Sequence, residues 1–99
     1  NETFAKKIDN LNKEKLRCWR LPLYSPYLLK IKSQVADLSN ASLDGMAGSI
    51  TAALFLQEFL KSPNIPWFHF DTFAWSQDSK GAALQGLDIM SDFLRKNFN

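Results

Sequence analysis

The chain has 99 residues, 45% of them hydrophobic and 22% charged, which suits one small globular domain and excludes a disordered tail. Its net charge is +2, and a single cysteine excludes an internal disulfide, so we expect a reducing compartment and a cytoplasmic protein. No apolar run approaches the length of a membrane span, and the polar start lacks the apolar core of a signal peptide.

Positive charge gathers in the first third of the chain. Residues 1–32 hold eight Lys or Arg and three Asp or Glu, whereas residues 33–99 hold four and seven. The lysines alternate with Asp9, Asn10 and Glu14, as on a solvated helix face, and no nucleic-acid motif accompanies them. We therefore expect neither a nucleic-acid nor a membrane partner.

The first predicted element is an amphipathic helix. Thr3 can cap it, and the helix is expected to run to about Leu16. Phe4, Ile8 and Leu11 lie on one stripe at helical spacing. Beyond it, "CWRLPLYSP" contains two prolines that limit helix, and its apolar residues alternate as in an extended segment. A short helix over 26–32 follows, since proline is accepted in a first turn.

The rest of the chain predicts strands alternating with helices. "VADLSN" is typical of a short strand or a sheet edge, and residues 49–60 predict a helix. "PWFHFDTF" is rich in aromatic residues and predicts a strand. A last helix over 82–96 is expected to bury Ala83, Leu87, Met90 and Leu94. This alternation indicates an α/β fold class.

Two of these elements need more cover than so short a chain provides. The helix over 49–60 is apolar on nearly every side, and such a helix must be covered all round. The strand over 67–73 carries bulky aromatic residues on both faces, which is typical of a central strand. Asp88 and Asp92 should be solvated on the last helix. We expect the chain to be part of something larger, because a sheet of two or three strands is marginal.

Four stretches resemble a known family. "WRLPLYSPYLLKIKSQVADLSN", "AGSITAALFLQEFL", "PWFHFDTFAW" and "SKGAALQGLDIMSDFL" have the order and spacing of the C-terminal part of leucyl aminopeptidases, the cytosol aminopeptidase or M17 metallopeptidase family. The resemblance implies that residues 1–99 are the C-terminal portion of the family's catalytic domain, with no internal domain boundary. It also implies a three-layer αβα architecture, helices packed on a mixed sheet, which is incomplete in this chain.

The resemblance implies a metal-dependent enzyme that releases N-terminal amino acids from peptides, typically as a cytoplasmic hexamer with two divalent ions, zinc or manganese. The family's metal ligands and catalytic Lys and Arg lie upstream, around Asn-Thr-Asp-Ala-Glu-Gly-Arg, which these residues do not contain. The segment is thus expected to supply scaffold and pocket walls, no metal ligand and no catalytic residue. Alone it should be inactive, and its partner is the missing upstream portion of the same protein.

The only histidine lies two residues before an aspartate, so His69 and Asp71 share one face of the predicted strand. The pair could be half a metal site or half a catalytic dyad. A catalytic metal needs about three protein ligands, and Cys18, Asp37 and Asp44 show no motif spacing with His69. A dyad needs a nucleophile or a second base nearby. We interpret His69 and Asp71 as structural supports, because a buried histidine needs a partner.

The resemblance also implies which residues form pocket walls. In the family, the turn after this strand helps to form the pocket for the substrate's first side chain, and here that turn contains Phe73 and Ser76. The segment after "ADLSN" borders the leaving-group side, which places Ala41 there. Core packing is the alternative interpretation of Phe73 and Ala41. The segment Phe73-Ala74-Trp75 departs from the usual Ala-Gly turn, so the substrate preference stays open.

A function of a different class also fits these residues. A non-catalytic scaffold or assembly module would keep the fold and lack the metal centre. Upstream sequence distinguishes the two functions, because a Lys- and Asp-rich metal motif there would identify the enzyme.

Overall fold

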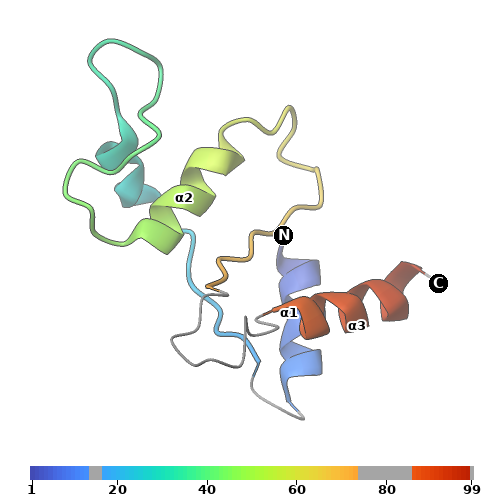
Figure 1. Cartoon of the computed structure of the whole chain (residues 1–99). Coiled ribbons are helices and arrows are strands. Elements are labelled where there is room, and N and C mark those ends of the chain that lie inside the picture. Colours follow the sequence, from blue (N-terminus) through green and yellow to red (C-terminus); the bar gives the residue numbers. More distant parts are fainter. Residues whose placement is uncertain (14–16, 74–85, 99) are drawn as a thin grey trace. The chain divides into compact units, whose positions relative to one another are not determined.

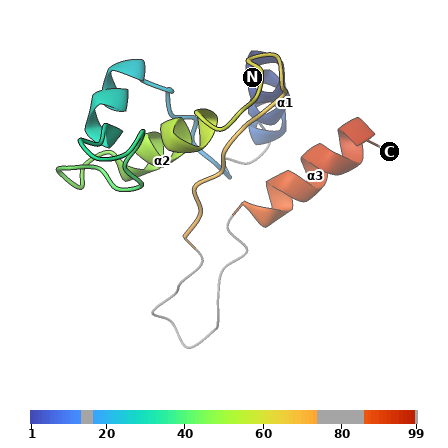
Figure 2. The same cartoon turned by 90° about the horizontal axis from the view of Figure 1, so that it is seen from above.

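The computed structural model describes residues 1–13, 17–73 and 86–98 (Figure 1). Its elements in chain order are α1 (Glu2–Asn12), the 3-10 helix η1 (Ser25–Ile31), α2 (Gly48–Gln57) and α3 (Leu87–Phe98). They form two compact units, one made of Asn1–Arg20 with Pro66–Asn99 and the other of Leu21–Ile65. The first unit contains α1 and α3, and the second contains η1 and α2 (Figures 1 and 2).

Helix α1 begins two residues earlier than the sequence predicts. The cap is Asn1, whose side-chain oxygen accepts a hydrogen bond from the Phe4 N–H at 3.2 Å. Thr3, the expected cap, is inside the helix. The negative charge of Glu2, in the first turn, interacts favourably with the positive end of the helix dipole. The helix ends at Asn12 rather than near Leu16, which lies outside the described residues.

The buried stripe of α3 differs from the expected one. Ile89 and Phe93 are fully buried, whereas Leu87 and Leu94 are 58% and 50% exposed and Met90 is half-buried. Ala83, the remaining member of the expected stripe, lies outside the described residues. The expected stripe is therefore wrong for this chain. Both stripes are apolar at helical spacing, and the helix buries the one that carries the aromatic ring.

The core of the first unit is built around that ring. Phe93 meets Phe4 and Phe68 edge to face, each with 5.3 Å between ring centroids. Such pairs contribute about 0.5–1.5 kcal/mol beyond the area that they bury. Phe93 thereby joins three pieces of chain that are far apart in sequence. The cluster consists of Ile8, Leu11, Ile89 and Phe93, with Phe4, Cys18, Phe68 and Phe70 packed against it.

Neither predicted strand forms within the described residues. Residues 66–73 have no regular secondary structure, and the only β feature in the described part of the chain is an isolated antiparallel bridge between Lys32 and Leu38. The period-two pattern still places Phe68 and Phe70 against the core. A strand, however, needs a neighbouring strand to pair its backbone in a repeated ladder. Among the described residues, the backbone nitrogen of Asn1 donates to the Trp67 carbonyl at 2.9 Å, and Asn1 belongs to no strand. The mixed sheet of the expected αβα domain is thus not formed by the described residues.

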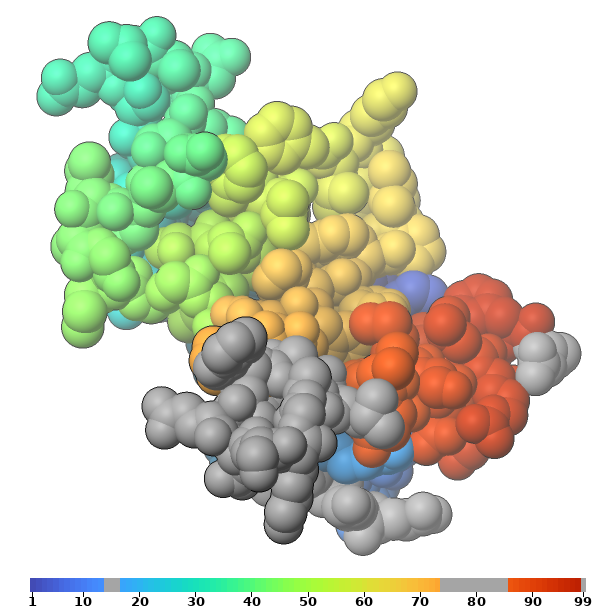
Figure 3. All heavy atoms as spheres, in the orientation of Figure 1, coloured from blue at the N-terminus to red at the C-terminus, as the bar shows by residue number. Residues whose placement is uncertain are grey.

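The second unit packs η1 against α2 (Figure 2). The short helix predicted over 26–32 is confirmed as η1, and the helix predicted over 49–60 as α2, which ends earlier, at Gln57. Of α2, only Thr51, Ala53 and Leu54 are buried, and its atoms reach the surface on the face shown in Figure 3. The all-round cover that its sequence demands is therefore not supplied by the described residues.

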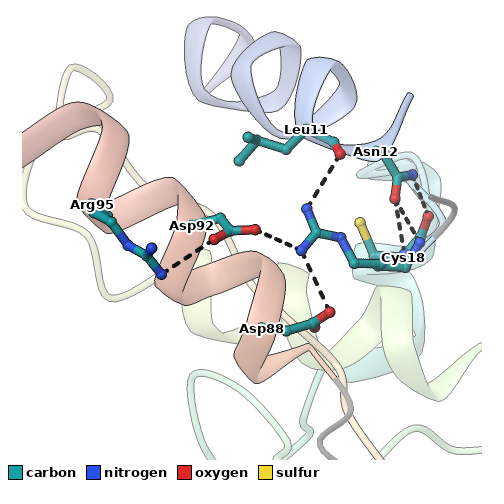
Figure 4. A network of polar contacts seen from close by, with 7 residues as sticks. Leu11, Asn12, Cys18, Asp88, Asp92 and Arg95 are labelled. Atoms are coloured by element: carbon teal, nitrogen blue, oxygen red, sulfur yellow. Dashed lines mark hydrogen bonds and ion pairs between the residues drawn. The ribbon is translucent and has the colours of Figure 1, made fainter. Parts of the chain in front are cut away.

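The guanidinium group of Arg17 connects α1 with α3. Its partners Leu11, Asp88 and Asp92 are labelled in Figure 4. Nη1 donates to Asp92 at 2.8 Å and to Asp88 at 3.4 Å, and Nη2 donates to the Leu11 carbonyl at 3.3 Å. Both aspartates reach solvent as expected, at 46% and 35% exposed, and both also pair with a side chain only 14% exposed, which the sequence did not predict. The hydrogen bond from Arg17 lowers the pKa of Asp92, and the same bond raises the pKa of Arg17.

Asn12 holds the backbone of Arg17 and Cys18 in place (Figure 4). Its Nδ2 donates to the Cys18 carbonyl at 2.7 Å, and its Oδ1 accepts from the N–H groups of Arg17 and Cys18 at 2.7 and 3.2 Å. Every polar group of the amide is thus used. Cys18 lies against the core, and burial raises the pKa of its thiol, so it packs as a small hydrophobic residue does.

We predict that Arg17→Met in the full-length protein lowers the melting temperature more than Arg95→Met. Both arginines pair with Asp92, but the Arg95 side chain is 67% exposed, and exposed pairs contribute little. Arg17→Lys should fall between wild type and Arg17→Met, because lysine keeps the charge and loses the planar fork.

We also predict how the effect of Arg17→Met on the melting temperature depends on pH. Asp92 has a lowered pKa in the folded state, so the stability it contributes is present above the unfolded carboxyl value of about 4 and is lost as the pH falls through the folded value. The gap in melting temperature between wild type and Arg17→Met should therefore narrow on acidification. A constant gap from pH 7 to pH 3 would contradict this account.

We predict that Ala47→Gly stabilises the protein. Ala47 caps α2 with φ 58° and ψ 37°, a left-handed conformation that costs a residue with a Cβ about 1–2 kcal/mol and costs glycine almost nothing. The matched control is Ala52→Gly, at an exposed position inside α2, where glycine should cost about 0.5–1 kcal/mol. Melting temperatures should therefore move in opposite directions, and a decrease for both variants would refute the strain at Ala47.

Candidate functional site

A hollow of about 430 Å³ opens on the second unit. Three pieces of chain line it: the end of η1, the loop that follows the β bridge, and one side of α2. We name residues 39–47 the rim loop. The lining is mostly apolar, and its polar side chains are Asn40, Ser42 and Thr51. The residues are Ile31, Asn40, Ala41, Ser42, Gly45, Gly48, Thr51, Ala52, Phe55 and Leu56.

Backbone hydrogen bonds attach the rim loop to η1. The Ser39 N–H donates to the Ile31 carbonyl at 2.8 Å, and the Leu43 N–H donates to the Lys30 carbonyl at 3.2 Å. Within the loop, the Ser39 hydroxyl donates to the Ala41 carbonyl at 2.9 Å and accepts from the Ala41 N–H at 3.3 Å. Ala41 is therefore fixed through both of its backbone polar groups.

The carboxylate of Asp44 is the second attachment. It accepts from the Lys30 ammonium, from the Ser42 hydroxyl at 2.8 Å and from the Met46 N–H at 3.0 Å. These bonds, the one from Lys30 foremost, hold the pKa of Asp44 well below its usual range. The Lys30 ammonium also lies 4.9 Å from the centroid of the Tyr27 ring, a favourable cation–π distance.

The residues predicted from the sequence take different places. Ala41 is exposed and lines the hollow, whereas Phe73 lies in the first unit and is 68% exposed. Ser76 lies outside the described residues. The half-buried ring of His69 stacks on Trp67 with 6.4 Å between centroids, and Asp71 is exposed. The supporting roles of His69 and Asp71 stay predictions.

Acidic and metal-binding side chains do not gather in the described part of the chain. Over residues 1–13, 17–73 and 86–98, no three His, Cys, Asp or Glu side chains lie together as metal ligands would. Asp88 and Asp92, two carboxylates on one helix, both face Arg17. None of the described helices has the length and apolar character needed to cross a membrane.

Sequence patterns did not reveal the link between Lys30 and Asp44. The two residues are 14 positions apart and belong to different elements, so no helix or strand periodicity relates them. The only signal was a turn-forming "SLDG", in which an aspartate before a glycine is typical of a tight loop.

Comparisons with known proteins give one consistent result. Residues 1–90 match the model of the cytosol aminopeptidase family, catalytic domain. The chain is 39% identical to a probable cytosol aminopeptidase of Cenarchaeum symbiosum, over 96% of the chain and 21% of that protein. It is also 39% identical to one of Histophilus somni, over 95% of the chain and 19% of that protein.

A solved structure agrees with these relatives. The crystal structure of cytosol aminopeptidase from Coxiella burnetii matches with a TM-score of 0.85 and 39% identity, over 100% of this chain and 23% of that one. The chain therefore spans about a fifth of the length of the proteins it matches. These findings confirm the resemblance drawn from the four sequence stretches. The chain belongs to the cytosol aminopeptidase family and is similar to part of its catalytic domain.

Proposed function

We propose that residues 1–99 are the C-terminal portion of the catalytic domain of a metal-dependent, leucyl-type aminopeptidase, which releases N-terminal amino acids from peptides in the cytoplasm. The observation that carries this proposal is the match of the whole chain to one cytosol aminopeptidase structure at 39% identity and a TM-score of 0.85. The family is established by that similarity, and the activity of the whole protein is the proposal.

In this proposal the segment supplies scaffold and pocket walls. Ala41 borders the leaving-group side, which its exposed position on the hollow supports. Phe73 and Ser76 border the pocket for the substrate's first side chain. The ring of Phe73 is exposed, which supports a role as a pocket wall. His69 and Asp71 act as supports.

Two divalent ions, zinc or manganese, belong to the proposed complete enzyme. The described residues do not fit the role of their ligands, because no group of three or more suitable side chains forms among them. We therefore propose that the ligands lie in the rest of the enzyme, and we assign no catalytic residue to this segment.

The partner of the segment is the remainder of the same catalytic domain, upstream in sequence, in an enzyme that assembles as a hexamer. Large apolar side chains of the second unit support this proposal, because they are exposed in the chain as it stands. Leu29 is 62% exposed, Leu43 83% and Phe59 64%. Exposed apolar surface of this kind marks an interface.

Assay of the full-length protein tests the proposal directly. It should release leucine from leucine p-nitroanilide, lose that activity on dialysis against a chelator, and recover it when zinc or manganese is restored. A correctly folded full-length protein without metal-dependent activity would instead identify the non-catalytic scaffold or assembly module.

We predict that residues 1–99 expressed alone are inactive and poorly folded. Metal-assisted hydrolysis needs ions held by clustered ligands, and α2 lacks its cover. The isolated chain should aggregate or bind dyes that report exposed apolar surface, and it should dock to a co-expressed upstream portion. A soluble monomer with a cooperative melt, or one that releases leucine with added metal, would contradict the prediction.

We predict that Phe73→Ala in the full-length enzyme shifts kcat/KM towards substrates with larger N-terminal residues. A bulky ring at the pocket wall restricts space, and its loss should change the ratio of large to small substrates by about 10–200-fold. The matched control is Phe98→Ala, which removes another exposed phenylalanine ring from the same unit. If the ranking of alanine, leucine and phenylalanine p-nitroanilides is unchanged, Phe73 is a packing residue.

A further inference from the structure

We propose that the ion pair between Lys30 and Asp44 is a positioning device that fixes the leaving-group wall of the hollow and so sets which second residue of a peptide is accepted. We name this pair the rim clasp. The inference rests on the proposed function, in which Ala41 borders the leaving group. Neither Lys30 nor Asp44 is assigned a chemical step.

The rim loop has little apolar packing to hold it. Leu43 is 83% exposed and Met46 is 66% exposed, and Ala41 is exposed as well. The buried residues of the second unit are Ile31, Thr51, Ala53 and Leu54, none of which belongs to the loop. A loop without buried side chains keeps one conformation only if hydrogen bonds and charges determine it.

The clasp connects the loop to the buried part of the unit. Lys30 precedes Ile31, which is 2% exposed, so the backbone that carries the lysine is anchored in the core. The ammonium reaches the carboxylate of Asp44, and the same carboxylate accepts from the Ser42 hydroxyl and the Met46 N–H. Ser42 and Met46 are local partners on the loop itself. Lys30 alone relates the carboxylate to a fixed helix.

The position of Ala41 depends on this connection together with the Ser39 hydrogen bonds described above. Ser42 follows Ala41 directly, and its hydroxyl is 2.8 Å from the Asp44 carboxylate. Further along the loop, Gly45 with φ 66° and Ala47 with φ 58° adopt left-handed conformations. For Ala47 this conformation is strained, and such strain persists only where the surroundings impose it. Releasing Lys30 should therefore let the loop relax and move Ala41 relative to Phe55 and Leu56, the α2 residues that also line the hollow.

The expected effect is on selectivity among leaving groups. A displaced wall alters the fit of a side chain on the second residue of the peptide, whereas leucine amide has no such side chain to be affected. Fit of one or two carbon groups in a pocket is worth about tenfold in kcat/KM. The pocket for the first residue should be unaffected, because it is not built from the rim loop.

The experiment uses the full-length enzyme and two clasp variants, Lys30→Met and Asp44→Asn. Lys32→Met and Asp37→Asn are matched controls, because they remove the same charges from exposed neighbouring positions outside the clasp. Steady-state kcat/KM is measured for leucine amide, Leu-Ala and Leu-Phe, which vary only the leaving group. It is also measured for alanine and leucine p-nitroanilides, which vary only the first residue.

We expect both clasp variants to change the ratio of Leu-Phe to leucine amide by about tenfold, with the ratio of the two p-nitroanilides unchanged. The controls should leave both ratios unchanged, and Lys30→Arg, which keeps the charge, should restore the wild-type ratio. An unchanged dipeptide ratio in active, folded clasp variants would overturn the proposal, as would an equal change of both ratios or an equal change in the controls. A wild-type enzyme that cleaves none of these substrates would instead overturn the proposed function, and this inference with it.

Discussion

One aromatic ring determines how the first unit is assembled. Phe93 is contributed by α3, and it meets Phe4 from α1 and Phe68 from the segment over 66–73. Loss of that ring would remove the contact at which the N-terminal helix, the aromatic segment and α3 all meet. Apolar packing drives the association of these elements. The ion pairs of Arg17 with Asp88 and Asp92 help to fix the orientation of α3, because charged hydrogen bonds depend on geometry.

The second unit is organised by a different kind of interaction. Its core is small, so polar contacts determine the shape of the rim loop, and the loop carries the residue that the resemblance places at a pocket wall. Binding residues commonly lie on loops that a rigid scaffold positions. Here the scaffold is the pair of helices η1 and α2, and the contacts of Asp44 transmit its rigidity to the loop.

Sequence periodicity predicted where the helices lie in the chain, but it did not predict which face of α3 is buried. The apolar residues of α3 form two overlapping stripes, and periodicity cannot choose between them, because the choice depends on Phe4 and Phe68 more than 20 residues away. The aromatic alternation over 67–73 correctly indicated which side chains share a face. It could not supply the neighbouring strand on which a sheet depends. For the site, the resemblance pointed to Ala41, but the contact of Lys30 with Asp44 follows from folding alone, since neither residue has local sequence that predicts the other.

The hydrogen bonds of Asn12 depend on its side chain being an amide, so deamidation to aspartate would disturb them. Deamidation to aspartate hardly changes the size or shape of the side chain, so size alone would predict no effect. In this fold, however, Nδ2 donates to the Cys18 carbonyl at 2.7 Å, and a carboxylate oxygen in its place would face that carbonyl with no proton between them. The two bonds accepted by Oδ1 would survive and hold the new charge there, so one spontaneous reaction would convert the clamp at the end of α1 into a repulsive contact.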